Sequence, residues 1–305
     1  MAIFVVPLHQ NFVGEVSGVD LCSPLENDTF SEISDALDRY AVLVFRNQQL
    51  TDEQQIAFSK HFGPLETAIG TIRKDRKHRL DSSTLADVSN LDENNNIRST
   101  SDRWRMFMLA NQLWHTDSSF KRVPGKVSVL SAHEVPLSGG ETEFADLRAA
   151  YDALDVATKE RIEGLVAEHS IFYSRSLIGY TEFSNEERAA LPAVPQTIVR
   201  IHPGSGRKTL YLASHASHII GWPMEQGRAL LDELVTFATQ PCFVHQHRWR
   251  TGDLVVWDNR CTLHRGRPYD DANCRRDMRR TTVEDSAPTL EQPRRATIAT
   301  ARRVP

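Results

Sequence analysis

The sequence has few of the features that mark specialised classes of protein. It contains four cysteines, Cys22, Cys242, Cys261 and Cys274, and no two of them have CxxC spacing. We therefore expect reduced thiols in a cytoplasmic protein, and neither a disulfide framework nor a cysteine zinc site. No stretch approaches the roughly 20 apolar residues of a membrane span. The apolar run at the start of the sequence is too short for a signal peptide and carries no charge. We therefore expect no association with a membrane.

Strong charge of one sign is also missing. The formal net charge is −4, from 36 basic and 40 acidic residues, which gives no electrostatic reason to expect nucleic acid as a partner. Hydrophobic residues make up 40% and charged residues 25%, as in an ordinary soluble globular protein. We expect one domain over residues 1–285. Residues 286–305 carry Pro288, Pro293 and Pro305 among mixed charges and are expected to form a disordered tail.

Hydrophobic patterning indicates a chain whose second half is rich in strands. Residues 66–108 are polar and weakly patterned, which is typical of a functional loop and makes them a candidate lid, with a solvated linker as the alternative. Helices are expected over residues 29–40, 51–61, 146–165 and 224–238, and strands over residues 4–13, 41–45, 242–249, 253–257 and 275–283.

One short motif has the spacing of a metal chelate. His115 and Asp117 are two residues apart, so on a strand both side chains face the same way. The pair alone is weak evidence, but His264 follows a predicted strand and supplies a second imidazole. Two histidines and a carboxylate leave positions open on Fe(II) for a 2-oxo acid and O2, whereas zinc favours a more closed site. The alternative is a buried core histidine at 115 and a turn histidine at 264.

Two arginines near the end of the chain suggest an anion site. Arg275 and Arg279 are four residues apart, so on a strand they share a face with Asp277 and Thr281. Cations that point into a barrel are costly to bury without a partner, and anionic ligands would compensate them. One arginine could hold the distal carboxylate of a co-substrate and the other an anionic substrate. A solvated basic face is the alternative.

With these motifs in place, the sequence as a whole resembles the taurine dioxygenase family of Fe(II)/2-oxoglutarate enzymes, and especially its members that act on aryloxyacetates. The resemblance covers roughly residues 5–285. The segments that carry it are LVFR at 43–46, QQIAF at 54–58, FGPL at 62–65, NQLWHTDSSF at 111–120, SGGETEF at 138–144, AAYDAL at 149–154, HASH at 215–218, WDNRC at 257–261 and HRG at 264–266.

The resemblance implies a mainly β fold with flanking helices, the double-stranded β-helix or jelly roll. It also implies Fe(II) as the metal, with 2-oxoglutarate and O2 as co-substrates. The site residues it implies are His115, Asp117 and His264 as iron ligands, Thr142 and Arg275 for 2-oxoglutarate, and Arg279, Asn111 and His215 for the substrate.

The resemblance further implies a small anionic aryl carboxylate as substrate. An aryloxyacetate hydroxylated next to its carboxylate would give a phenol and glyoxylate, with succinate and CO2. The alternatives are an arylacetate such as indole-acetate, an aryloxypropionate, a sulfonate or an alkyl sulfate. A metal-free jelly-roll module that binds carboxylates is the alternative outside the enzyme class. A homo-oligomer is expected.

Overall fold

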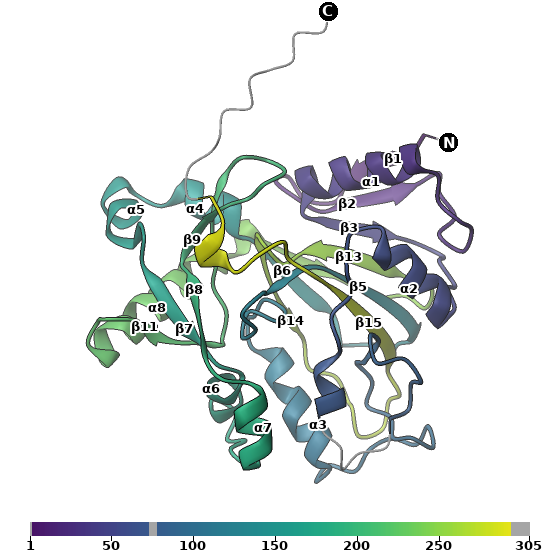
Figure 1. Cartoon of the computed structure of the whole chain (residues 1–305). Helices are drawn as coiled ribbons and strands as arrows, with labels where there is room; N and C mark the ends of the chain where they lie inside the picture. Colours follow the sequence, from purple (N-terminus) through teal and green to yellow (C-terminus); the bar gives the residue numbers. More distant parts are fainter. Residues whose placement is uncertain (1, 73–77, 294–305) are drawn as a thin grey trace, which may run out of the picture.

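A seven-stranded sheet forms the larger wall of the fold (Figure 1). The computed structural model describes residues 2–72 and 78–293. All neighbouring strands of this sheet are antiparallel except β2 and β3. In spatial order the strands are β1 (Phe4–Pro7), β2 (Gly14–Ser17), β3 (Val42–Phe45), β13 (Leu254–Asp258), β5 (Gly125–Glu134), β15 (Asp277–Glu284) and β4 (Ala86–Asp87).

A smaller antiparallel sheet forms the second wall, in the order β12 (Val244–His247), β6 (Thr142–Asp146) and β14 (Thr262–Gly266). Phe144 of β6 packs with Trp257 and Met278 of the large sheet, so apolar side chains from both sheets fill the space between them. This arrangement confirms the predicted double-stranded β-helix.

Two helices cover the outer face of the large sheet, α1 (Asn27–Tyr40) and α2 (Asp52–Lys60). The predicted cap of α2 is present, because Thr51 accepts a hydrogen bond from the Gln54 backbone and the Gln54 side chain accepts one from the Thr51 backbone. Ile33 and Leu37 of α1 pack on Leu43 of the sheet. The apolar stripe of α1 therefore explains its position.

A third group of elements lies beside the small sheet. The helix expected over residues 146–165 is two helices, because Asp155 caps a new one by accepting a hydrogen bond from the Thr158 backbone. The strands of this group are β7 (Val166–His169), β8 (Val194–Thr197), β9 (Val199–Ile201), β10 (Lys208–Leu210) and β11 (Ala216–Ile219). Its helices are α4 (Leu147–Ala153), α5 (Val156–Ile162), α6 (Ile171–Ser176), α7 (Asn185–Ala190) and α8 (Met224–Ala238).

The segment expected to be a loop contains short elements. They are the 3-10 helix η1 (Ile69–Ile72), β4 and α3 (Arg103–Met108), which continues into η2 (Leu109–Gln112). Trp104 and Phe107 of α3 pack against Ile171 of α6 and against Tyr180. This aromatic cluster joins α3 to the third group of elements.

The boundary expected for the disordered tail is wrong for its first residues. Thr289 is buried in the 3-10 helix η4 (Thr289–Glu291) and donates a hydrogen bond to Gln196, while Gln292 donates one to Asp285. Polar side chains of the tail thus find buried partners that the sequence does not reveal. Residues 294–305 lie outside the described residues.

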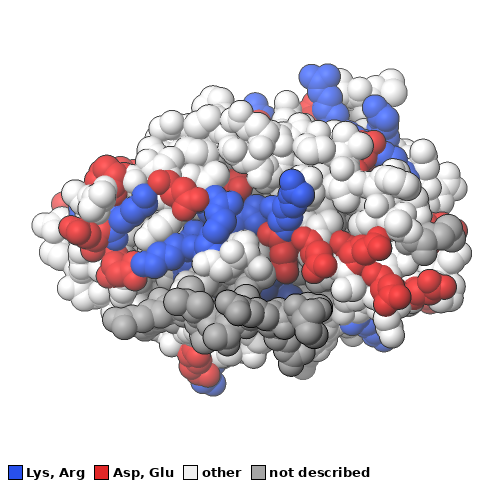
Figure 2. Space-filling model, turned by 90° about the horizontal axis from the view of Figure 1, so that it is seen from above, with Lys and Arg blue, Asp and Glu red and all other residues white. Residues whose placement is uncertain are grey.

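All four cysteines lie within the described residues, and all are free. Among the described helices, none combines the length and apolarity needed to cross a membrane. On the face seen in Figure 2, basic side chains form a band bordered by acidic ones.

Candidate active site

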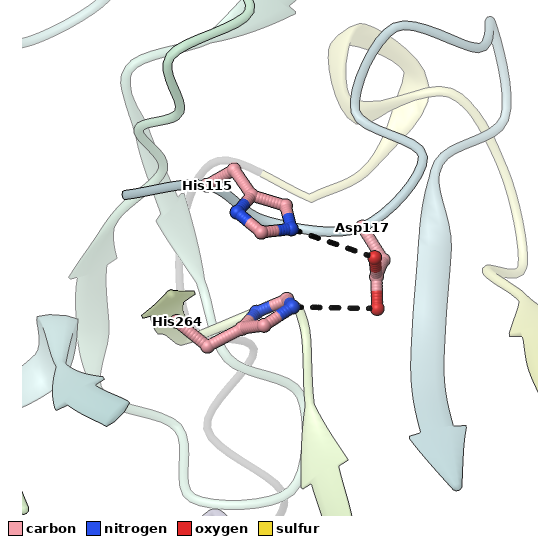
Figure 3. A group of neighbouring side chains, drawn as sticks. All are labelled: His115, Asp117 and His264. Carbon is pink, nitrogen blue, oxygen red and sulfur yellow. Dashed lines mark ion pairs between the residues drawn. The ribbon is translucent and has the colours of Figure 1, made fainter. Parts of the chain in front are cut away.

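Two histidines and one aspartate converge between the two sheets. The backbones of His115 and His264 bond to each other in both directions, with N···O distances of 3.0 and 2.8 Å. Asp117 begins the turn that follows, in which Ser118 has a φ of 56°. The Nε2 atom of His115 lies 4.0 Å from Asp117 Oδ1, and that of His264 lies 3.7 Å from Asp117 Oδ2 (Figure 3). His115 and Asp117 were expected on one strand. An isolated bridge at His115 and a turn at Asp117 bring their side chains together instead.

The donor atoms of these residues fit a divalent transition metal. His115 Nδ1 lies 2.8 Å from the carbonyl oxygen of Leu113, which places its proton on Nδ1 and leaves the Nε2 lone pair available. Ser128 donates a hydrogen bond of 2.7 Å to Asp117. The three ligand atoms lie within 4.8 Å of one another and all three residues are buried. Two imidazoles and one carboxylate are the ligand set of non-haem Fe(II) oxygenases.

The protonation states of the three residues suit that role. Burial lowers the pKa of His115 and holds the pKa of His264 well below its ordinary value, so both imidazoles are neutral at neutral pH. Burial raises the pKa of Asp117, but Arg280 and the two imidazoles outweigh it, and the net pKa is lowered. The site therefore presents two neutral nitrogens and one carboxylate.

The larger of two cavities at this centre has a volume of about 380 Å³. His115 and Asp117 line it together with residues of the candidate lid, between Glu66 and Val88 and in α3. The lining includes apolar and aromatic side chains from the lid and from outside it, namely Ile69, Trp104, Phe107, Phe120 and Ile171. The lid itself stays a prediction, but its residues do form walls of this cavity.

The smaller cavity, of about 130 Å³, lies on the His264 side of the centre and shares His115 and Asn111 with the larger one. Thr142 and Arg276 line it. Thr142 Oγ1 accepts a hydrogen bond of 2.9 Å from Trp249, so its own hydroxyl proton is still available to a ligand. Arg276 has a buried Nε without a partner. Thr142 and Arg276 therefore offer this cavity a hydroxyl donor and a guanidinium.

The two predicted arginines face away from the site. Arg275 is exposed and bonds to Glu134 with an N···O distance of 3.0 Å. Arg279 bonds to Asp52 of α2 at 2.6 Å and to Asp277 at 3.3 Å, on the outer face of the sheet. The expectation that Arg275 and Arg279 point into the barrel is therefore wrong.

Their neighbours Arg276 and Arg280 line the cavities instead. Strand alternation shows which residues share a face but not which face is inside. The sequence did hold a signal, because Asp277 shares a face with Arg279 and could already neutralise it. Arg280 Nη1 donates to Asp117 Oδ1 at 2.5 Å, so this guanidinium adjoins the metal-ligand group.

The other predicted residues lie at the cavities. Asn111 lines both of them. His215 is buried and lines the larger one, and its Nδ1 lies 3.0 Å from Ser119 Oγ. Sequence reasoning missed Arg175, which also lines the larger cavity. It lies on α6, and no local pattern in the sequence connects it with the metal-ligand residues.

Comparison with known proteins agrees with this geometry. The family model described as "Taurine catabolism dioxygenase TauD, TfdA family" matches residues 5–282. An alpha-ketoglutarate-dependent 2,4-dichlorophenoxyacetate dioxygenase of Cupriavidus pinatubonensis is 47% identical over 94% of this chain and 99% of the relative. An (S)-phenoxypropionate/alpha-ketoglutarate-dioxygenase of Sphingobium herbicidovorans is 39% identical over 88% of this chain and 91% of the relative.

A solved structure is similar throughout. The crystal structure of AAD-2 in complex with Mn(II) and N-oxalylglycine has a TM-score of 0.92 and 50% identity, and the match covers 95% of this chain and 100% of that chain. Fold and donor set together define a non-haem iron oxygenase. The chain belongs to the TauD/TfdA family of dioxygenases. It is an enzyme of the Fe(II)- and 2-oxoglutarate-dependent class, and the predicted resemblance is confirmed.

Proposed function

We propose that this enzyme hydroxylates the carbon next to the carboxylate of an aryloxyacetate similar to 2,4-dichlorophenoxyacetate. The hydroxylated ether then splits into a phenol and glyoxylate, while 2-oxoglutarate becomes succinate and CO2. The observation that carries the proposal is the position of the His115, Asp117 and His264 group between two cavities, a smaller one lined by Thr142 and Arg276 and a larger one lined by Trp104, Phe107 and Phe120. The name of the Cupriavidus relative supports the same substrate class.

We assign 2-oxoglutarate to the smaller cavity. The iron held by His115, Asp117 and His264 supplies the activation of O2 when it is bound. Arg276 would pair with the distal carboxylate of 2-oxoglutarate, and Thr142 would donate its hydroxyl proton to the same ligand. Arg276 thus takes the role expected of Arg275, because it is the member of the pair that faces the cavity.

We assign the aryl substrate to the larger cavity. Trp104, Phe107 and Phe120 give the ring an apolar surface that also excludes water. Arg280 takes the role expected of Arg279 and attracts the acidic group of the substrate toward the metal-ligand residues. Asn111 and His215 line the same cavity and can orient the substrate by hydrogen bonds. Orientation of the reacting C–H bond governs rate as well as binding.

An aryloxypropionate is the second candidate substrate. The Sphingobium relative is named for phenoxypropionate and is 39% identical. Such a substrate carries one more methyl group at the reacting carbon. The same cavity walls and the same arginine would serve it.

Product analysis tests the proposal. Succinate and phenol would be measured together with phenoxyacetate, 2-phenoxypropionate, indole-acetate and taurine as substrates. We expect phenol and succinate in equal amounts from phenoxyacetate, and little succinate above background with taurine. Turnover of taurine without turnover of any aryloxy acid would contradict the proposed substrate class.

The cellular setting is also a proposal. The four free cysteines support a cytoplasmic location, since disulfides are rare there. The net charge of −4 gives no support to nucleic-acid binding. A homo-oligomer stays a prediction, which size-exclusion chromatography with light scattering would test.

A further inference from the structure

Arg175 is a buried cation in the wall of the larger cavity. It lies on α6, and 6% of its surface is exposed. His115, His215 and Arg280 line the same cavity. No role in binding has so far been given to this side chain.

The contacts of Arg175 leave its charge uncompensated. Its Nη1 donates to Ser174 Oγ at 3.0 Å, and its guanidinium carbon lies 4.2 Å from the centre of the Phe107 ring. Its Nε is buried without a hydrogen-bond partner. Within residues 2–72 and 78–293, no carboxylate forms an ion pair with it. A hydroxyl and an aromatic face are therefore its whole set of direct partners.

Other deeply buried arginines of the chain differ in this respect. Arg148 pairs with Asp146 at 3.0 Å, Arg200 with Asp285 at 2.6 Å and Arg260 with Asp258 at 2.5 Å. Partnered burial is the usual condition for a charged side chain, because an unpaired buried charge is strongly unfavourable. Arg175 departs from that pattern at the point where the chain forms a cavity.

The electrostatics point to an absent anion. Burial, together with the charge of Arg280, lowers the pKa of Arg175 to about 9, so the guanidinium stays charged at neutral pH. Asp117 favours the charge of Arg175, but this carboxylate is already bonded to Arg280 and Ser128. An anionic ligand in the larger cavity would supply the missing counter-charge.

We infer that Arg175 binds the acidic group of the primary substrate, as a second cation beside Arg280. The inference rests on the proposed function and adds a specificity-determining residue to it. 2-Oxoglutarate is not the anion concerned, because Arg175 does not line the smaller cavity. The contact with Phe107 fixes the guanidinium at the aromatic wall. An aryl acid can therefore place its ring and its carboxylate on neighbouring groups.

Calorimetric binding with a charged and an uncharged ligand tests this inference. The full chain would be loaded with Mn(II) and 2-oxoglutarate under argon and titrated with phenoxyacetate or phenoxyacetamide. We expect Arg175→Met to weaken binding of the acid at least about tenfold, since an ion-pair partner is lost. Affinity for the amide should change far less. Arg175→Lys should bind the acid with intermediate affinity, because it keeps the charge but not the planar fork.

Arg188→Met is the matched control. Arg188 also stacks on the aromatic cluster, 5.3 Å from Phe172, but it is exposed and does not line the cavity. We expect it to bind both ligands as the parent does. Affinity for 2-oxoglutarate should be unchanged in all variants. Thermal unfolding of metal-free Arg175→Met should occur at or above the parent temperature, since an unpaired buried charge has been removed.

Several outcomes would overturn the inference. One is parent-like binding of the acid by Arg175→Met, and another is an equal loss for acid and amide, which would indicate packing alone. The parent could fail to bind phenoxyacetate but bind indole-acetate or phenyl sulfate. If Arg175→Met then weakens binding of that anion, the proposed substrate is wrong and the role of Arg175 is supported. If the parent binds none of these anions, both fail.

Discussion

Within residues 2–72 and 78–293, two buried groups have the composition of a metal site. His115, Asp117 and His264 form the first, and His202, Asp258 and Cys261 form the second. In each group the candidate ligand atoms lie within 4.8 Å of one another and all three residues are buried. Proximity and burial therefore do not distinguish them.

The groups differ in what their lone pairs already contact. Asp258 accepts hydrogen bonds from the side chain of Arg260 at 2.5 Å and from His202 at 2.9 Å, and His202 Nδ1 contacts Ser205 at 2.9 Å. Neither cavity described above reaches this group. At the first group the Nε2 atoms of both histidines are 3.7–4.0 Å from the carboxylate, too far for hydrogen bonds, and cavities adjoin them. Histidine Nε2 lone pairs that are unused and lie beside a cavity thus indicate a metal centre, whereas a histidine with both ring nitrogens bonded, like His202, indicates a structural network.

The largest effect is expected from removing a ligand of the first group. His264→Ala should abolish turnover and iron binding, because a metal ligand is lost. The fold should remain, because the Nδ1 atom of His264 has no hydrogen-bond partner to lose. Circular dichroism should be nearly unchanged. Cys261→Ala is the control in the second group, since the contact of its Sγ atom with the Asp258 carbonyl oxygen is long, at 3.9 Å, and the variant should keep full iron content.

The second group should respond in stability instead. Burial raises the pKa of Asp258, but Arg260 and His202 hold it well below its ordinary value. Asp258→Asn leaves the buried Arg260 without its carboxylate and should lower the free energy of unfolding by about 3–5 kcal/mol. Asp117→Asn should lower the free energy of unfolding of the metal-free protein much less. Urea unfolding of both variants measures the difference, and equal losses would remove the distinction between the groups.

Two consecutive arginines just before β15 allow a similar contrast. Arg276→Met should raise the 2-oxoglutarate concentration needed for half-maximal rate at least about tenfold, because a buried carboxylate loses its cation. Arg275→Met, on the solvent face, should behave as the parent. Steady-state assays with 2-oxoglutarate varied would show this. A dependence on Arg275 alone would mean that the strand is inverted.

A smaller effect is expected from a change that keeps the charge. Arg280→Lys loses the planar fork and should place the substrate less accurately, so less phenol forms for each succinate. The matched variant on the outer face is Arg279→Lys. Phenol and succinate would be quantified in the same samples. An unchanged ratio in Arg280→Lys would remove Arg280 from substrate positioning.

Local physics made much of the fold predictable. The cap at Thr51 and the apolar stripe of α1 are sequence patterns, and both helices formed where expected. The metal-ligand group was predicted because the resemblance connected His115 with the distant His264. The sequence did not predict which face of β15 points into the barrel. Alternation allows either face, and the choice depends on packing against α2, where Arg279 bonds to Asp52. Arg175 and Thr289 were missed because their surroundings come from segments far away in the sequence.

Anaerobic titration with Fe(II) in the presence of 2-oxoglutarate tests the central claim most directly. A metal-to-ligand charge-transfer band should rise until one iron is bound per chain in the parent and in Cys261→Ala. It should be absent in His264→Ala and should require far more 2-oxoglutarate in Arg276→Met. A full band in His264→Ala, or its loss in Cys261→Ala, would contradict the assignment of the metal centre.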